Sequence, residues 1–132
     1  QGVRIFMLDR AEVVTVLEET FQMPESFDSA GYFADFYGVR RSDDAKQKVV
    51  IKVSSRIRDL IRTVPLHKSQ EEIETSKEYS LFEYYMTPNF DFKQEIISYL
   101  DSLEVIEPLS LRKEIGRTML DVYLKYREDI KG

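Results

Sequence analysis

The chain has 132 residues, of which 42% are hydrophobic and 33% charged, and this balance predicts a soluble, globular protein rather than a disordered one. Its formal net charge of −5 disfavours direct binding to duplex DNA, because such binding draws most of its affinity from cations that neutralise phosphates. Cysteine is absent, and no apolar run reaches the roughly 18 residues of a membrane span, so we expect neither disulfides nor membrane insertion, and a cytoplasmic location.

The start of the chain predicts two extended segments, residues 3–10 and 12–21. The second is rich in β-branched side chains, which favour strands. In the first, Arg4 and Arg10 would share one face with two hydrophobic side chains, because side chains alternate along a strand. Such a face is suited to holding an anion beside an apolar surface. Because the chain begins at Gln1 without an initiator methionine, we expect that a segment precedes it.

Residues 23–46 predict a linker that contains a short helix. Asp28 or Ser29 is suited to cap the start of this helix, and Gly38 is suited to end it. The polar run at residues 40–47 then marks a domain boundary.

The rest of the chain predicts an orderly α+β domain. The expected elements are a strand at 48–53, a helix capped by Ser54 or Ser55, strands at 70–75 and 79–87, a helix at 92–102, a strand at 104–107 and a last helix at 111–127. This β-α-β-β-α-β order is the ferredoxin-like arrangement, with two helices on one face of an antiparallel sheet and an additional C-terminal helix. The other sheet face needs a cover, which the last helix or a second subunit could supply.

The strand at 79–87 favours core packing over base stacking. Phe82 and Tyr84 fall on one face, which we expect to be buried, whereas Tyr79 and Tyr85 fall on the other. Glu83 lies between these two tyrosines, which disfavours an RNA-binding surface.

No catalytic constellation is evident. His67, the only histidine, lies in a polar stretch and predicts a surface residue. Arg58 and Arg62 lie one helical turn apart and predict solvated charges or a small anion patch. No glycine-rich phosphate-binding pattern occurs, and we expect no enzymatic activity, no metal and no cofactor.

Three stretches taken together resemble bacterial transcription regulators with WYL domains. Residues 4–10, RIFMLDR, are similar to a strand at the end of the WYL domain, and residues 18–39 are similar to the segment that follows it. Residues 104–112, EVIEPLSLR, are similar to the end of the WYL C-terminal extension. Two departures are the missing W-Y-L triplet and the turn at residues 99–103, YLDSL, where the family usually has a glycine.

The resemblance implies three parts. Residues 1–22 would be the terminal strands of an incomplete WYL domain with an Sm-like barrel, residues 23–46 a linker, and residues 47–132 the ferredoxin-like extension. The whole would be the effector-sensing, dimerising and signal-transmitting part of a regulator whose DNA-binding domain is missing from this chain.

The resemblance also implies partners. Arg10, assisted by Arg4, would contact a nucleotide or single-stranded nucleic-acid effector, and duplex DNA would bind only through the missing domain. The equally weighted alternative is that Arg10 pairs with Asp9 or Glu12 to hold the strand. A homodimer is expected.

Two other functions stay open. A small-metabolite-binding domain of the same topology would need a pocket between the sheet and the helices, lined by convergent polar groups. A single-stranded nucleic-acid-binding module would need Tyr79, Tyr85 and the arginines on one exposed face.

Overall fold

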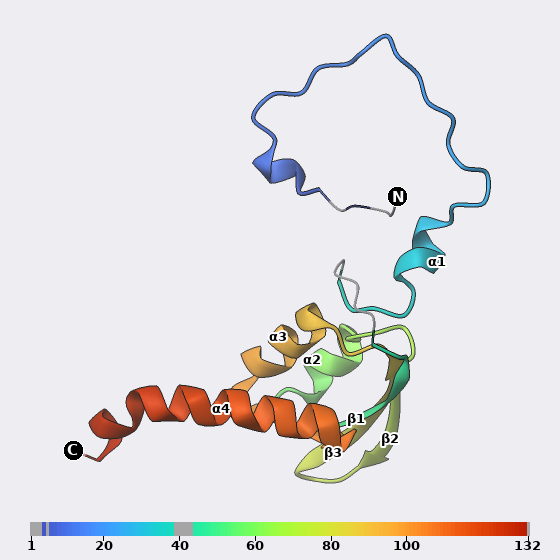
Figure 1. The fold of residues 1–132 in the computed structure, drawn as a ribbon. Helices are drawn as coiled ribbons and strands as arrows, with labels where there is room; N and C mark the ends of the chain where they lie inside the picture. The colour runs from blue at the N-terminus through green and yellow to red at the C-terminus, as the bar shows by residue number, and fades with distance from the viewer. Residues whose placement is uncertain (1–3, 5, 39–43, 132) are drawn as a thin grey trace.

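A four-stranded antiparallel sheet in the order β2-β3-β1-β4 organises the C-terminal part of the chain (Figure 1). The computed structural model describes residues 4, 6–38 and 44–131. Its strands are β1 (Gln47–Ser54), β2 (Glu71–Thr75), β3 (Tyr79–Met86) and β4 (Leu103–Glu107). Its helices are α1 (Ser29–Phe33), α2 (Arg58–Thr63), α3 (Phe90–Ser98) and α4 (Leu109–Ile130). The fold is mixed α/β, and from β1 onward the strands and helices follow the predicted order.

Alternation along β3 separates the core from the opposite face of the sheet. Phe82 and Tyr84 are 1% and 0% exposed, which confirms the prediction that this face is buried. The antiparallel register sets Ile51 of β1 opposite Phe82 and Val49 opposite Tyr84, and all four side chains belong to one core cluster. Full burial of each such side chain contributes about 1.5–3 kcal/mol.

The helices close the core from one side. Ile61 of α2, Phe92 of α3 and Leu111 of α4 are at most 3% exposed and belong to the same cluster. Helix α2 begins later than predicted, because Ser54 serves the preceding turn: its hydroxyl accepts the N–H of Arg56 at 3.2 Å.

The C-terminal helix does not cover the other sheet face. This result differs from one of the two predicted covers, which was this helix. Its first half packs beside β4 on the helical side, through Leu111 and Ile115. Its second half extends away from the sheet and the other helices (Figure 1). The apolar side of α4 lies against Leu103 and Val105 of β4, whose side chains face the core. Helix α4 is therefore a third helix on the same side of the sheet as α2 and α3.

Charged side chains line the open face of the sheet. Val50, on this face, is only 5% exposed. Its register partners are Glu83 on β3 and Glu107 on β4, and Lys48 Nζ lies 3.9 Å and 3.0 Å from their carboxylates. The aliphatic stems of these long side chains therefore shield Val50 while their charges stay in water.

The two N-terminal strands predicted for residues 3–10 and 12–21 are wrong for the described residues. Residues Leu8–Arg10 form a short 3-10 turn, and residues 11–27 have no helix or strand. A strand needs a neighbour for its backbone N–H and C=O groups, and all four described strands lie between residues 47 and 107. Residues 3 and 5 of the first segment lie outside the described residues.

The turn before β4 contains a residue in a backbone conformation that suits glycine, at the place where the sequence lacks the glycine expected from the resemblance. Leu100 has φ +51°, in the left-handed region that glycine adopts without strain. Its side chain is 70% exposed, so the apolar residue gains little from packing.

Candidate functional site

The predicted effector-contacting arginines lie outside the folded body. Arg4 and Arg10 are both exposed, and Arg10 ends the 3-10 turn rather than a strand. Within the described residues, the side chain of Arg10 pairs with neither Asp9 nor Glu12, so the structural alternative for this arginine is not observed. The structure brings Arg4 and Arg10 to no common site with the body.

The arginines of α2 are committed to acidic and backbone partners. Arg62 donates to both carboxylate oxygens of Glu72, at 2.9 Å and 2.7 Å, and also pairs with Asp59 at 2.9 Å. The hydrogen bonds from Arg62, together with those from hydroxyl groups nearby, lower the pKa of Glu72 to about 2. Arg58 donates to the carbonyl oxygen of Ser76 at 2.7 Å. Carboxylates therefore neutralise Arg62, and Arg58 is held by a backbone carbonyl group, so the two do not form a free anion patch.

The tyrosines of β3 do not join these arginines. Tyr79 lies beneath Lys52, whose Nζ is 4.4 Å from the ring centre, and Tyr85 lies beneath Lys46 at 5.0 Å. Both belong to the open face, whereas Arg62 binds Glu72, whose register partner Phe82 faces the core. Arg62 therefore does not share a face with Tyr79 and Tyr85, as a single-stranded nucleic-acid surface built from these residues would require.

Residues 34–38, which we call the linker dock, bind the body where β3 ends. Asp28 caps α1 just before them, as predicted, by accepting the N–H of Ala30 at 3.1 Å. Phe36 then forms a parallel bridge with Thr87, whose N–H donates to the carbonyl oxygen of Asp35 at 2.9 Å. The dock adds a short strand-like contact to the end of the sheet.

His67 holds the dock from below, and the prediction that it is a surface residue is wrong. It is 7% exposed. Its Nδ1 accepts the N–H of Ser69 at 3.1 Å, so Nε2 carries the hydrogen and donates to the carbonyl oxygen of Ala34 at 2.8 Å. Burial lowers the pKa of His67, which favours the neutral ring that this arrangement requires.

Asn89 fixes the other end of the dock. Its Nδ2 donates to the carbonyl oxygen of Tyr37 at 2.8 Å, while its Oδ1 caps α3 by accepting the N–H of Phe92 at 3.0 Å. The Tyr37 and Phe92 rings pack edge to face with centres 6.1 Å apart. Gly38 closes the segment with φ +66°, and a Cβ there would lie 2.8 Å from the carboxylate of Asp91.

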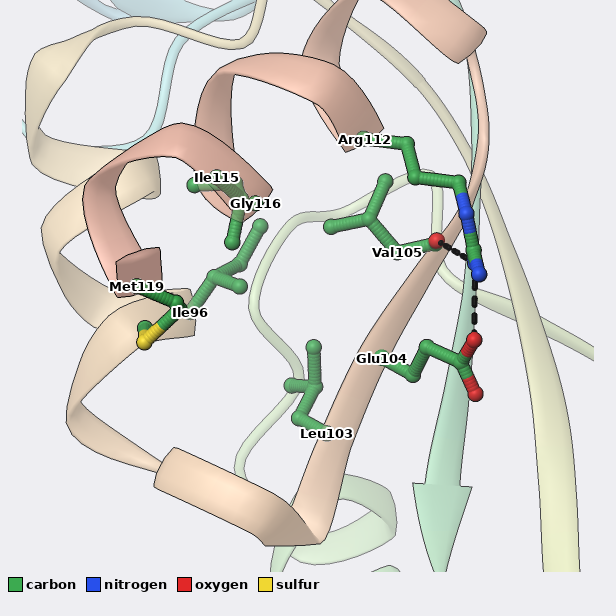
Figure 2. A pocket seen from close by; sticks show the side chains of 8 residues that line it. All are labelled: Ile96, Leu103, Glu104, Val105, Arg112, Ile115, Gly116 and Met119. Atoms are coloured by element: carbon green, nitrogen blue, oxygen red, sulfur yellow. Dashed lines mark hydrogen bonds and ion pairs between the residues drawn. The ribbon is translucent and has the colours of Figure 1, made fainter. Parts of the chain in front are cut away.

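A groove of about 250 Å³ opens between α3, β4 and α4 (Figure 2). Its walls are mostly apolar, and the side chains that line it include Ile96, Leu103, Val105 and Met119. Such a wall favours an apolar side chain or small apolar ligand over a polar one.

Arg112 and Gly116 shape the rim of this groove. Arg112 donates to the carbonyl oxygen of Val105 at 2.6 Å and pairs with Glu104 at 2.7 Å (Figure 2). Because Glu104 lies on the open face and α4 on the helical side, the arginine wraps around the edge strand. A Cβ at Gly116 would meet no atom within 4 Å, so this glycine leaves the groove open.

The comparisons with known proteins agree with the predicted extension. The WCX domain family, whose WCX domain is the WYL C-terminal extension domain, matches residues 45–123 of the 132. The chain belongs to the WCX domain family. No curated protein matches the chain.

The groove lies inside the residues that match the WCX family, and the linker dock lies outside them. The groove lies within the matched residues, and so do His67 and Asn89. The linker dock at residues 34–38 precedes the match, so it is a contact between the WCX domain and the chain upstream of it. No described helix combines the length and the apolar character that a membrane crossing needs.

Sequence reasoning missed His67 and Asn89 as dock residues. The only local signal for Asn89 is its position just before a predicted helix, where asparagine is a favoured cap. Nothing near His67 in the sequence points to Ala34, which is 33 residues away.

Proposed function

We propose that this chain is the C-terminal regulatory part of a bacterial DNA-binding transcription regulator of the WYL type. The WCX domain, a ferredoxin-like unit, would carry dimerisation and transmit a signal, and it would act by conformational change rather than catalysis. The effector would bind upstream, in the WYL part, and the DNA-binding domain would belong to the complete protein.

The linker dock is the observation that carries this proposal. Three carbonyl groups of the dock, those of Ala34, Asp35 and Tyr37, each accept a hydrogen bond from the body. The donors are, in the same order, the ring of His67, the backbone N–H of Thr87 and the side-chain amide of Asn89. Contacts at three successive points prevent the segment from sliding or pivoting freely. A displacement of the upstream chain would therefore move the WCX domain with it.

The exposed apolar side chains before the dock support the proposal that another part of the complete protein packs against them. Val13, Val16 and Phe21 are between 81% and 94% exposed. A run of such residues favours a partner surface, and the rest of a WYL barrel would supply both apolar contacts and strand neighbours.

The mechanism is a shift between two arrangements. An anionic effector that binds better to one placement of the upstream strands would favour that placement, and the dock would pass it to the WCX domains of the dimer. The DNA-binding domains would then change their spacing. Arg10, with Arg4, is the proposed anion contact.

A binding experiment tests the sensor part. We would measure the affinity of a short fluorescent single-stranded oligonucleotide for the complete regulator and for this chain, over a salt series. Strong binding to the regulator, weak binding to this chain and a loss of affinity in Arg10→Ala would support the proposal. Equal binding by this chain alone would favour a nucleic-acid-binding module instead, and no binding to either would exclude an oligonucleotide effector.

A second experiment tests transmission through the dock. His67→Ala in the complete regulator should leave oligonucleotide affinity unchanged and reduce the effect of the oligonucleotide on operator binding. Lys68→Ala, at the exposed neighbouring position, is the matched control and should keep that effect. An unchanged effect in His67→Ala would contradict a signalling role for the dock.

A further inference from the structure

Helix α4 carries a second stripe beside the one that packs on the body. Its members recur at alternating spacings of three and four residues, and we call them the seam: Arg112, Gly116, Met119, Tyr123, Tyr126 and Ile130. This average spacing of 3.5 is the repeat by which two helices pair along their length. The body-facing stripe, through Leu111 and Ile115, points to a different side of the helix.

The distal half of the seam is exposed. Tyr123, Tyr126 and Ile130 are 49%, 60% and 66% exposed, on the part of α4 that extends away from the body (Figure 1). Solitary apolar residues are common on surfaces, but three along one helical stripe form a surface suited to another protein.

The proximal half of the seam is recessed. Gly116 and Met119 line the groove in Figure 2, and Arg112 bounds it. Glycine is a poor helix former, and here no atom of the chain lies near enough to require the absence of a Cβ. A group from outside the chain that approaches this point of α4 would require it.

We propose that two copies of this chain pair through α4, antiparallel, with the distal half of each seam against the proximal half of the other. Tyr126 of the second copy enters the groove at Gly116. Tyr123 of the second copy packs on Met119, and Ile130 of the second copy packs on the aliphatic stem of Arg112. Each layer thus sets an exposed apolar side chain against a recess or a flexible side chain.

The occupant is a second copy because recess and protrusion lie on the same helix. A twofold interface needs one surface that is complementary to itself, and the seam meets this need when it is reversed end to end. The groove of about 250 Å³ has mostly apolar walls, which favour an aromatic side chain, and the pairing fills both grooves of the dimer at once. This inference rests on the dimerisation in the proposed function and assigns it a surface.

Cysteine crosslinking tests the register, because the chain contains no cysteine of its own. Gly116→Cys and Tyr126→Cys should form few disulfides separately, since the proposed register holds identical positions about 15 Å apart along the helix axis. Mixed together under mild oxidation, the two variants should form a heterodimer rapidly. Gly116→Cys mixed with Lys125→Cys is the matched control, because Lys125 is next to Tyr126 in sequence but lies about 100° around the helix axis from it and outside the seam.

Sedimentation equilibrium tests the energetics. Gly116→Gln, which fills the groove with a good helix former, and Tyr126→Gln should each raise the dimer dissociation constant at least tenfold while circular dichroism stays unchanged. Leu124→Gln removes a neighbouring exposed apolar side chain outside the seam and should leave the constant unchanged.

Two outcomes would overturn the inference. A monomer at every concentration, with no selective crosslinking, excludes α4 pairing in this chain. A dimer that ignores the seam variants shows that a different surface is used, and dimerisation in the proposed function then survives without this assignment. Loss of oligonucleotide binding in the complete regulator would instead refute the sensor proposal and leave the pairing intact.

Discussion

Nε2 of His67 donates a hydrogen bond of 2.8 Å to the carbonyl oxygen of Ala34, and this bond joins the WCX domain to the segment that precedes it. On the other side of the ring, Nδ1 accepts the N–H of Ser69 at 3.1 Å and lies 2.7 Å from the hydroxyl oxygen of the same residue. Burial of the ring favours the neutral imidazole, whereas the hydrogen bond to Ala34 favours the protonated one, and burial has the larger effect on the pKa.

Loss of His67 should destabilise the chain. We expect His67→Ala to lower the free energy of unfolding by about 1–3 kcal/mol, because a partly buried carbonyl group loses its donor and the buried ring leaves a cavity. His67→Gln offers a donor that does not titrate and should cost less. Urea unfolding followed by circular dichroism measures both, and equal losses in the two variants would contradict the role of the hydrogen bond.

Stability should also depend on pH through His67. Burial lowers its pKa below the usual value of about 6.5, while the backbone contact to Ala34 and nearby Asp35 oppose the shift. The folded state therefore takes up the proton less readily than the unfolded state, so stability is highest above pH of about 6.5 and falls as the pH drops toward the folded pKa. Unfolding at pH 7.5 and pH 5 should differ by less in His67→Gln than in the parent chain.

Glu72 should govern stability at more acid pH. Its pKa falls from 4.5 to about 2, chiefly through the hydrogen bonds from Arg62, so its contribution is complete above pH of about 4.5 and is lost as the pH falls toward 2. Because the pair is partly exposed and screened, Glu72→Gln should cost only about 1 kcal/mol at pH 7. Glu71→Gln, on the adjacent exposed position, is the control and should change little.

Leu100 offers a stabilising substitution. A non-glycine residue at φ +51° carries about 1–2 kcal/mol of strain, and relief of that strain outweighs the greater backbone freedom of glycine in the unfolded chain. Leu100→Gly should therefore raise the melting temperature in a thermal scan. A lower melting temperature would mean that the exposed leucine makes contacts that matter more than its backbone conformation.

Gly38 should show the opposite behaviour. With φ +66° and Asp91 at 2.8 Å from a Cβ, Gly38→Ala should cost about 1–2 kcal/mol, concentrated in the dock. Hydrogen exchange should show faster exchange of the Thr87 amide, which donates to Asp35, with little change in β1. Uniform acceleration would indicate a global loss of stability instead.

The sequence predicted the elements whose signals are local. Alternation placed Phe82 and Tyr84 in the core, and residue type and position predicted a cap at Asp28 or Ser29, of which the structure shows Asp28. The prediction of a strand at residues 12–21 was wrong, because β-branched residues favour extended backbone but a strand also needs a neighbouring strand to bond with. The prediction that His67 is a surface residue was wrong for a related reason, since its partner Ala34 is distant in sequence.

The candidate surfaces divide in the same way. The 3.5-residue spacing of the α4 seam can be read from the sequence, since it depends only on the helix repeat. The groove cannot, because it depends on how α4 crosses β4 and on the empty space at Gly116.

Arg112 has a consequence for the chain during synthesis. It wraps around one edge of the sheet to reach Glu104, while the other edge, β2, presents the carboxylates of Glu71, Glu72 and Glu74. Acidic or occupied edges discourage the addition of foreign strands. The valine-rich residues 12–17 are synthesised before this sheet, and edges of this kind disfavour the addition of such a segment to it as a further strand.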